Sequence, residues 1–144
     1  MSVYRFSPDK INYFSLILDL TAYLTVKNNW FHNCMRKTDK KIDNAIISAL
    51  TEVCEVALKE VAGFKWITHF VNYRDVANSL IVVCVFGSNS ELSNALKAGQ
   101  DHVLRQLIQQ QLTAVNIKLR KPVNFDSEQA CDEQNNGDWQ QRYG

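Results

Sequence analysis

The sequence lacks most of the motifs from which a protein's chemistry can be predicted. No G-x-x-x-x-G-K, G-x-G-x-x-G, H-E-x-x-H or G-x-S-x-G motif occurs in its 144 residues, so the commonest phosphate, dinucleotide, zinc-protease and serine-hydrolase signatures are missing. Glycine (5) and proline (2) are scarce, which excludes a collagen-like or low-complexity chain. A net charge of +1 excludes the strongly basic composition of many nucleic-acid-binding domains.

Cysteine and histidine are few and unpaired along the chain. No C-x-x-C pair occurs, and the cysteines are spaced too widely for a compact disulfide framework. The histidines fall on separate segments without the spacing of zinc ligands. We therefore expect no metal, no cofactor and a reducing, cytoplasmic location. These residues are Cys34, Cys54, Cys84, Cys131, His32, His69 and His102.

The sequence has no hydrophobic run long enough to span a membrane. Residues 11–26 are the most apolar stretch near the start, but Asp19 interrupts them and no small-x-small cleavage site follows. We expect neither a membrane segment nor an export signal. From Phe14 to Val26 apolar and polar residues largely alternate, which favours a strand, with a bent amphipathic helix as the alternative.

The first half of the remaining chain predicts a helix and a hairpin. Thr38 or Asp39 can cap an amphipathic helix that continues to Val61 and is stopped by Gly63. Two β-rich runs then follow, 64–73 and 80–86, and a polar connection joins them. We expect them to pair as an antiparallel hairpin.

The second half predicts helices around a third strand. Ser88 and Glu91 form a capping box for a helix that Gly99 can break in two. Alternation over 115–120 indicates a strand, which Pro122 ends. A short helix is expected over 126–131.

These elements define an α+β fold with the order α-β-β-α-β-α from residue 35. We expect two layers, with a small three-stranded sheet (the hairpin plus a crossover strand) covered by two long helices. The third strand can lie beside the first or the second, and we favour the first, which makes 64–73 central. The predicted domain spans 35–134, with residues 1–34 as an extension and 135–144 as a tail.

One pair of residues suggests catalysis. If the hairpin turns at Val76–Ala77, His69 lies opposite Cys84, and a cysteine beside a histidine can be an activated nucleophile. Cys84 lies in a run that looks buried on both faces, where thiolate formation is disfavoured, and no third group orients the histidine. We therefore expect a packed structural pair and a protein that is not an enzyme.

Basic residues give a nucleic-acid-binding hypothesis. One group begins the first helix, and a second lies on the predicted third strand, where it could share a sheet face with Lys65 and His69 and stack single-stranded nucleic acid. The alternative is an ordinary solvated surface. The candidate contacts for nucleic acid or a partner are Arg36, Lys37, Lys40, Lys41, Lys65, Lys118, Arg120 and Lys121.

Five blocks of the sequence resemble a family of short gammaproteobacterial proteins of unknown function. The blocks are residues 35–44, 49–55, 66–73, 79–86 and 125–131, in that order, so the resemblance covers about residues 35–143. It implies a start at Met35, with residues 1–34 read from an earlier start codon; the alternative is a genuine extra segment that pairs with the sheet. The resemblance supplies no catalytic residues. Members often carry the label of a Fis-family transcriptional regulator. Fis-type regulators bind DNA through a basic C-terminal helix-turn-helix, whereas the region after residue 126 of this sequence is acidic.

The apolar run 80–86 predicts a dimer. Its side chains point to both faces of the sheet, so either the set Leu80, Val82, Cys84 and Phe86 or the set Ile81, Val83 and Val85 lies away from the helices. Residues 11–26, the C-terminal segment with Phe125 and Trp139, or a second copy could cover that set. We favour a second copy, with the first set as the dimer face. The expected function is a homodimeric protein-interaction module, with nucleic-acid binding as the alternative.

Overall fold

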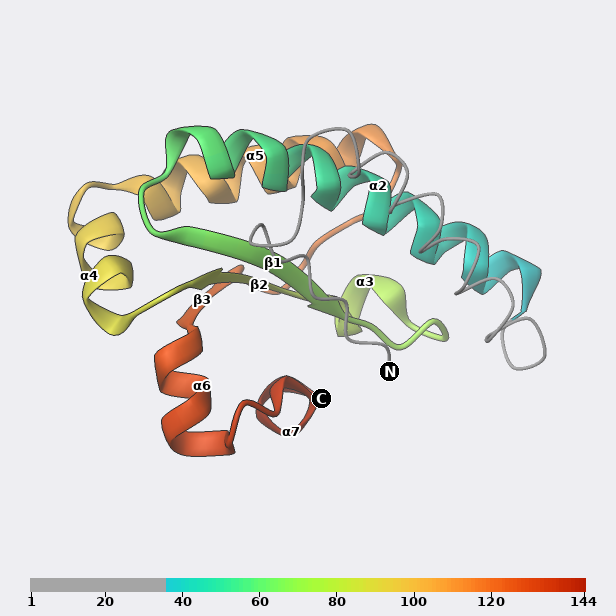
Figure 1. The fold of residues 1–144 in the computed structure, drawn as a ribbon. Coiled ribbons are helices and arrows are strands. Elements are labelled where there is room, and N and C mark those ends of the chain that lie inside the picture. Colours follow the sequence, from blue (N-terminus) through green and yellow to red (C-terminus); the bar gives the residue numbers. More distant parts are fainter. Residues whose placement is uncertain (1–35) are drawn as a thin grey trace, which may run out of the picture.

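The computed structural model describes residues 36–144. The predictions for residues 1–34, including the segment 11–26, His32 and Cys34, lie outside these residues. The chain forms the predicted α+β fold, in which helices pack on a three-stranded sheet (Figure 1). Its elements are α2 (Lys37–Glu60), β1 (Phe64–Phe70), α3 (Val76–Ser79), β2 (Ile81–Phe86), α4 (Asn89–Lys97), α5 (Gln100–Ala114), β3 (Asn124–Ser127), α6 (Glu128–Asn135) and α7 (Trp139–Tyr143).

The sheet has the order β1-β2-β3 and combines the predicted hairpin with a crossover strand. β1 and β2 are antiparallel, and β3 runs parallel to β2 after the two helices α4 and α5. The prediction that residues 64–73 form the central strand is wrong, because β3 pairs with β2 and leaves β1 at one side of these three strands. β2 is therefore paired on both sides, in keeping with its unbroken run of apolar residues.

The predicted strand over 115–120 is also wrong. α5 ends at Ala114, and Asn116 takes a left-handed conformation (φ 60°). The following residues form an extended link to β3, in which Ile117 and Leu119 pack partly against the core while Lys118 and Arg120 are exposed. The alternation thus reflects one side of a link lying against the core, and strand pairing begins only at Asn124, beyond Pro122.

Helix ends follow the sequence signals with one exception. α2 begins at Lys37 without a side-chain cap, so the predicted caps Thr38 and Asp39 are wrong. Asp39 lies in the first turn instead, where its charge faces the positive end of the helix dipole. The Ser88–Glu91 capping box is present, with the Glu91 amide donating to Ser88 Oγ at 3.2 Å.

Two predicted glycine signals are confirmed. Gly63, with φ +80°, follows the end of α2, and an added Cβ there would meet the Glu91 side chain at 2.7 Å. Gly99, with φ +74°, separates α4 from α5 as predicted. Both positions require a backbone conformation that other residues rarely adopt.

A first core lies between the sheet and the helices α2 and α5, which cover one face (Figure 1). The predicted dimer face belongs to this core: Leu80, Val82, Cys84 and Phe86 are each at most 1% exposed. That prediction is wrong about which set of β2 side chains lies away from the helices. The choice depends on pleat register, which an uninterrupted apolar run does not reveal.

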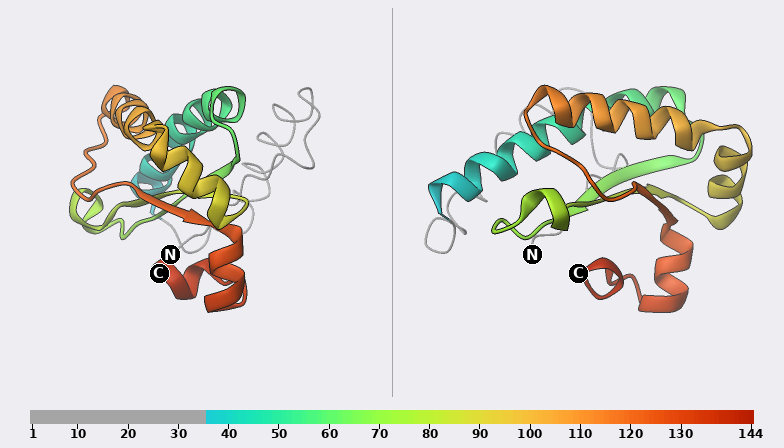
Figure 2. Two further views of the ribbon diagram at one scale, coloured as in Figure 1. Left: turned by 90° about the vertical axis from the view of Figure 1, so that its left-hand side faces the viewer. Right: turned by 180° about the vertical axis from the view of Figure 1, so that it is seen from behind.

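A second, smaller core lies on the opposite face of the sheet. There α6 and α7 pack beneath the strands (Figure 2). The prediction that residues 135–144 form a tail is therefore wrong, because Trp139 and Tyr143 of α7 pack against the apolar face of β1 and β2. The members of this core are Trp66, Phe70, Val83, Val85, Cys131 and Trp139, with Ile81 and Tyr143 partly buried against it.

Candidate functional site

Basic side chains gather at the end of the molecule that carries the hairpin connection. The start of α2, the loop around α3 and the link after α5 all lie at this end (Figures 1 and 2). Arg120 donates from Nη1 to Asn78 Oδ1 of α3 at 2.9 Å, which joins the link to the hairpin. We call this set the basic end; its members are Arg36, Lys37, Lys40, Lys41, Arg74, Lys118, Arg120 and Lys121.

The basic end is not neutralised within the described residues. None of its members forms an ion pair with an acidic side chain of residues 36–144, and all are exposed except the half-buried Lys40. The acidic residues of these three segments are Asp39, the buried Asp43 and Asp75. By contrast, Arg105 and Arg142 both form ion pairs, with Asp101 and Asp126. The free charges are therefore available to an anionic partner.

Along α2 the basic end continues as a polar stripe. Lys37, Lys41, Asn44 and Ser48 recur at spacings of four and three, so they lie on one face of the helix, and all four are exposed. Glu52, one turn further on, ends the stripe with a negative charge. The stripe provides cationic and amide hydrogen-bond donors on a single helix face.

Two expectations about basic residues are wrong. Lys65 lies at the start of β1, away from the hairpin end, and is not part of the basic end. The proposed stacking surface is also absent, because Ile67 and His69 face the helices and are at most 2% exposed. That face is covered by α2 and α5, while the 115–120 strand meant to complete it does not form.

A buried polar cluster lies beneath the first part of α2. Asp43, fully buried, approaches His69 of β1, whose Nε2 lies 3.2 Å from Asp43 Oδ1. Tyr73 donates its hydroxyl hydrogen to the same oxygen at 2.6 Å. These contacts join the helix to the end of β1 and place a carboxylate where water is excluded. Buried charged groups of this kind need such partners to be stable.

The hypothesis of a His69–Cys84 nucleophile is wrong about register. Cys84 pairs with Ile67, and His69 pairs with Val82, because the hairpin turns one residue earlier than Val76–Ala77 implies. Burial raises the pKa of the Cys84 thiol above its ordinary range and that of Cys54 to about 12. Both thiols are therefore held in the unreactive protonated form.

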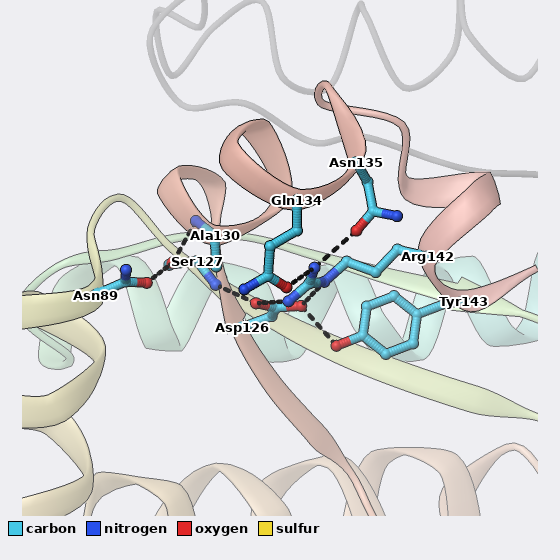
Figure 3. A network of polar contacts seen from close by, with 8 residues as sticks. All are labelled: Asn89, Asp126, Ser127, Ala130, Gln134, Asn135, Arg142 and Tyr143. Carbon is cyan, nitrogen blue, oxygen red and sulfur yellow. Dashed lines mark hydrogen bonds and ion pairs between the residues drawn. The ribbon is translucent and has the colours of Figure 1, made fainter.

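A second polar network fixes α7 to the sheet (Figure 3). Asp126 in β3 is 5% exposed. Arg142 donates two hydrogen bonds to its carboxylate, from Nε at 2.5 Å and from Nη2 at 3.1 Å. The hydroxyl of Tyr143 donates to the same carboxylate at 2.6 Å. Arg142 also donates from Nη1 to Gln134 and Asn135 of α6. This bidentate geometry is among the strongest that side chains form.

Ser127 connects this network to the rest of the fold. Its hydroxyl accepts from the Ala130 amide at 3.0 Å, capping α6, and donates to Asn89 of α4 at 2.5 Å. Arg105 supports β3 from the other side, donating to the Val123 carbonyl at 2.9 Å with its guanidinium 4.7 Å from the centre of the Phe125 ring. The short strand β3 is thus held by side chains from α4 and α5.

We expect stability to depend on Tyr143 at alkaline pH. Burial and the bond to Asp126 raise the pKa of Tyr143 above its ordinary value of 10. Its stabilising effect is therefore complete below pH 10 and is lost as the pH rises further. Tyr143→Phe should cost about 1–2 kcal/mol near pH 8. Above pH 10 this difference should shrink by up to about 1.4 kcal/mol per pH unit. Urea unfolding of both proteins across this range measures it; a constant difference would contradict the assignment.

Sequence reasoning missed Asp43, Asp126 and Arg142. Asp43 sits at a position of α2 where the helical pattern predicts the apolar face, between Ile42 and Ile46, and this interruption was the available signal. No comparable signal marks the pairing of Asp126 with Arg142, because α6 and the turn after it separate β3 from α7.

Comparison of the chain with known protein families, with curated proteins and with solved structures found no match. Within residues 36–144 no three histidine, cysteine or acidic side chains gather as metal ligands would. The helices of the same region include none with the length and apolar character of a membrane span.

Proposed function

We propose that the protein is a non-enzymatic binding module that holds nucleic acid through its basic end. The observation that supports this is that three segments distant in sequence, each carrying exposed cationic side chains, lie at one end of the molecule. A phosphate backbone is a regular array of negative charges, and lysine and arginine side chains displace its counterions on binding. The acidic α6 lies away from this end (Figure 1).

The stripe on α2 supports contact with a groove as well as with phosphates. Lys37 and Lys41 can neutralise the backbone, while Asn44 carries the side-chain amide that can pair with a base edge. The helix is 24 residues long, and its first turns extend past the hairpin (Figure 1). The exposed link residues Lys118 and Lys121 can add further phosphate contacts.

A salt titration with and without the stripe charges tests the proposal. We expect the protein to bind a short mixed-sequence DNA duplex with an affinity that falls steeply as salt rises. Lys37→Ala with Lys41→Ala should weaken binding and reduce the slope of log affinity against log salt by roughly 2. Fluorescence anisotropy measures both quantities. Single-stranded DNA and RNA of the same length show which form is preferred.

The matched control removes two lysines elsewhere. Lys65→Ala with Lys97→Ala lowers the net charge by the same amount but alters neither α2 nor the link. It should leave the slope nearly unchanged. Absence of binding to all three nucleic acids at low salt would refute the proposal, and an equal loss in the control would show that binding depends on net charge alone.

A further inference from the structure

The contacts of α7 point to an exchange of this segment between two copies of the chain. Trp139 packs edge-on against Trp66 with ring centres 4.8 Å apart, and Tyr143 stacks on Phe70 at 5.9 Å. Together with the Arg142–Asp126 pair these contacts combine apolar burial with a directional ion pair. Such a combination resembles the way a face recognises a separate peptide segment.

A tight turn is the covalent connection between α6 and α7. Asn136 and Gly137 both have left-handed conformations, with φ 51° and 76°, and Asp138 then begins α7. A helix of five residues is not stable without its tertiary contacts. When the turn opens, α7 therefore loses its structure and its site on the sheet becomes available at the same time.

The surface that α7 covers is apolar, so its exposure to water is unfavourable. Trp66, Phe70, Val83 and Val85 are fully buried there, and exposure of such a group of side chains favours association. Thr68 lies on the same face, paired with Val83, and its buried hydroxyl has no hydrogen-bond partner among residues 36–144. The segment that packs on this face is α7. Because a second copy of the chain carries the same segment, it can supply an identical α7 to this face.

We propose that two copies form a symmetric dimer by exchanging residues 138–144, so that each copy's Asp126 is held by the partner's Arg142 and Tyr143. All contacts of α7 with β1, β3 and α6 would form unchanged between the copies, including those to Gln134 and Asn135. Only the turn at Asn136–Gly137 has to extend. A reciprocal exchange between two copies closes with two-fold symmetry. This dimer does not depend on nucleic-acid binding.

Charge reversal at one ion pair tests the exchange. Asp126→Arg and Arg142→Asp each place like charges together, within one copy and between identical copies. In a mixture of the two variants, exchanged heterodimers restore both pairs. We expect the unaltered protein to sediment as a dimer, each variant alone to be mainly monomeric, and the equimolar mixture to give a one-to-one heterodimer in native mass spectrometry. The double variant in one chain should dimerise with itself.

A second measurement needs no substitution, in case the charge reversals prevent folding. Isotope-labelled and unlabelled protein are unfolded together and refolded, and isotope-filtered NMR detects contacts between the copies. Contacts between Trp66 of one copy and the partner's Trp139 are expected. A monomer at high protein concentration, or Trp66–Trp139 contacts found only within a copy, would overturn the proposal.

Discussion

Replacing Trp66 by alanine is expected to lower the free energy of unfolding by about 3–5 kcal/mol. The indole is fully buried in the second core, where it contacts Trp139 and donates from Nε1 to Glu128 Oε1 at 2.8 Å. Alanine leaves a cavity between the sheet and α7 and also removes the bond to α6. Urea unfolding followed by circular dichroism measures the loss.

Two controls separate packing from other effects of the Trp66 substitution. Trp66→Phe keeps an aromatic ring but removes the donor, so its cost should lie between those of the alanine variant and the unaltered protein. Val103→Ala truncates a side chain that is 49% exposed, and it should change stability by less than about 0.5 kcal/mol. If Trp66→Ala cost no more than Val103→Ala, the second core would not be a packed part of the fold.

Asp43→Ala is expected to destabilise the protein by roughly 3 kcal/mol. The carboxylate is fully buried and contacts both His69 and Tyr73, so its removal takes an acceptor from two side chains in a water-excluded position. The effect should appear in thermal and urea unfolding alike.

The matched control for Asp43 is Asp39 on the same helix. Asp39 is half-buried in the first turn, where its interaction with the helix dipole is worth about 0.3–1 kcal/mol. Asp43→Asn retains one oxygen acceptor and should recover part of the loss seen with alanine. Equal losses for Asp43→Ala and Asp39→Ala would show that the buried cluster does not contribute to stability.

Local signals in the sequence predicted an element correctly where the residue types were compatible with only one local structure. The Ser88–Glu91 capping box and the break at Gly99 lie where their residue types require, since a box needs a hydroxyl and a carboxylate three residues apart and a left-handed residue favours glycine. Pairing partners were less predictable. Alternation over 115–120 looks the same whether a segment pairs with a strand or only lies along a core, and nothing local selects the neighbour of a crossover strand.

The same distinction between local signals and tertiary contacts applies to the candidate site. The start of α2 was recognisable as basic, but the position of the link after α5 at the same end of the molecule depends on the tertiary fold. The residues that hold α7 were not recognisable, because Asp126 and Arg142 meet only after α6 and the turn that follows it have reversed the chain. Contacts of this type follow from the tertiary fold and cannot be derived from spacing alone.

The order of the elements has a consequence for synthesis of the chain on the ribosome. The sheet face made by Trp66, Phe70 and Val85 is complete early, whereas Trp139 and Tyr143, which cover it within residues 36–144, follow more than fifty residues later. At roughly 5–20 residues per second several seconds pass before α7 can pack on that face. During this interval the nascent chain presents a ready binding site for chaperones, and two chains emerging side by side can each receive the helix of the other.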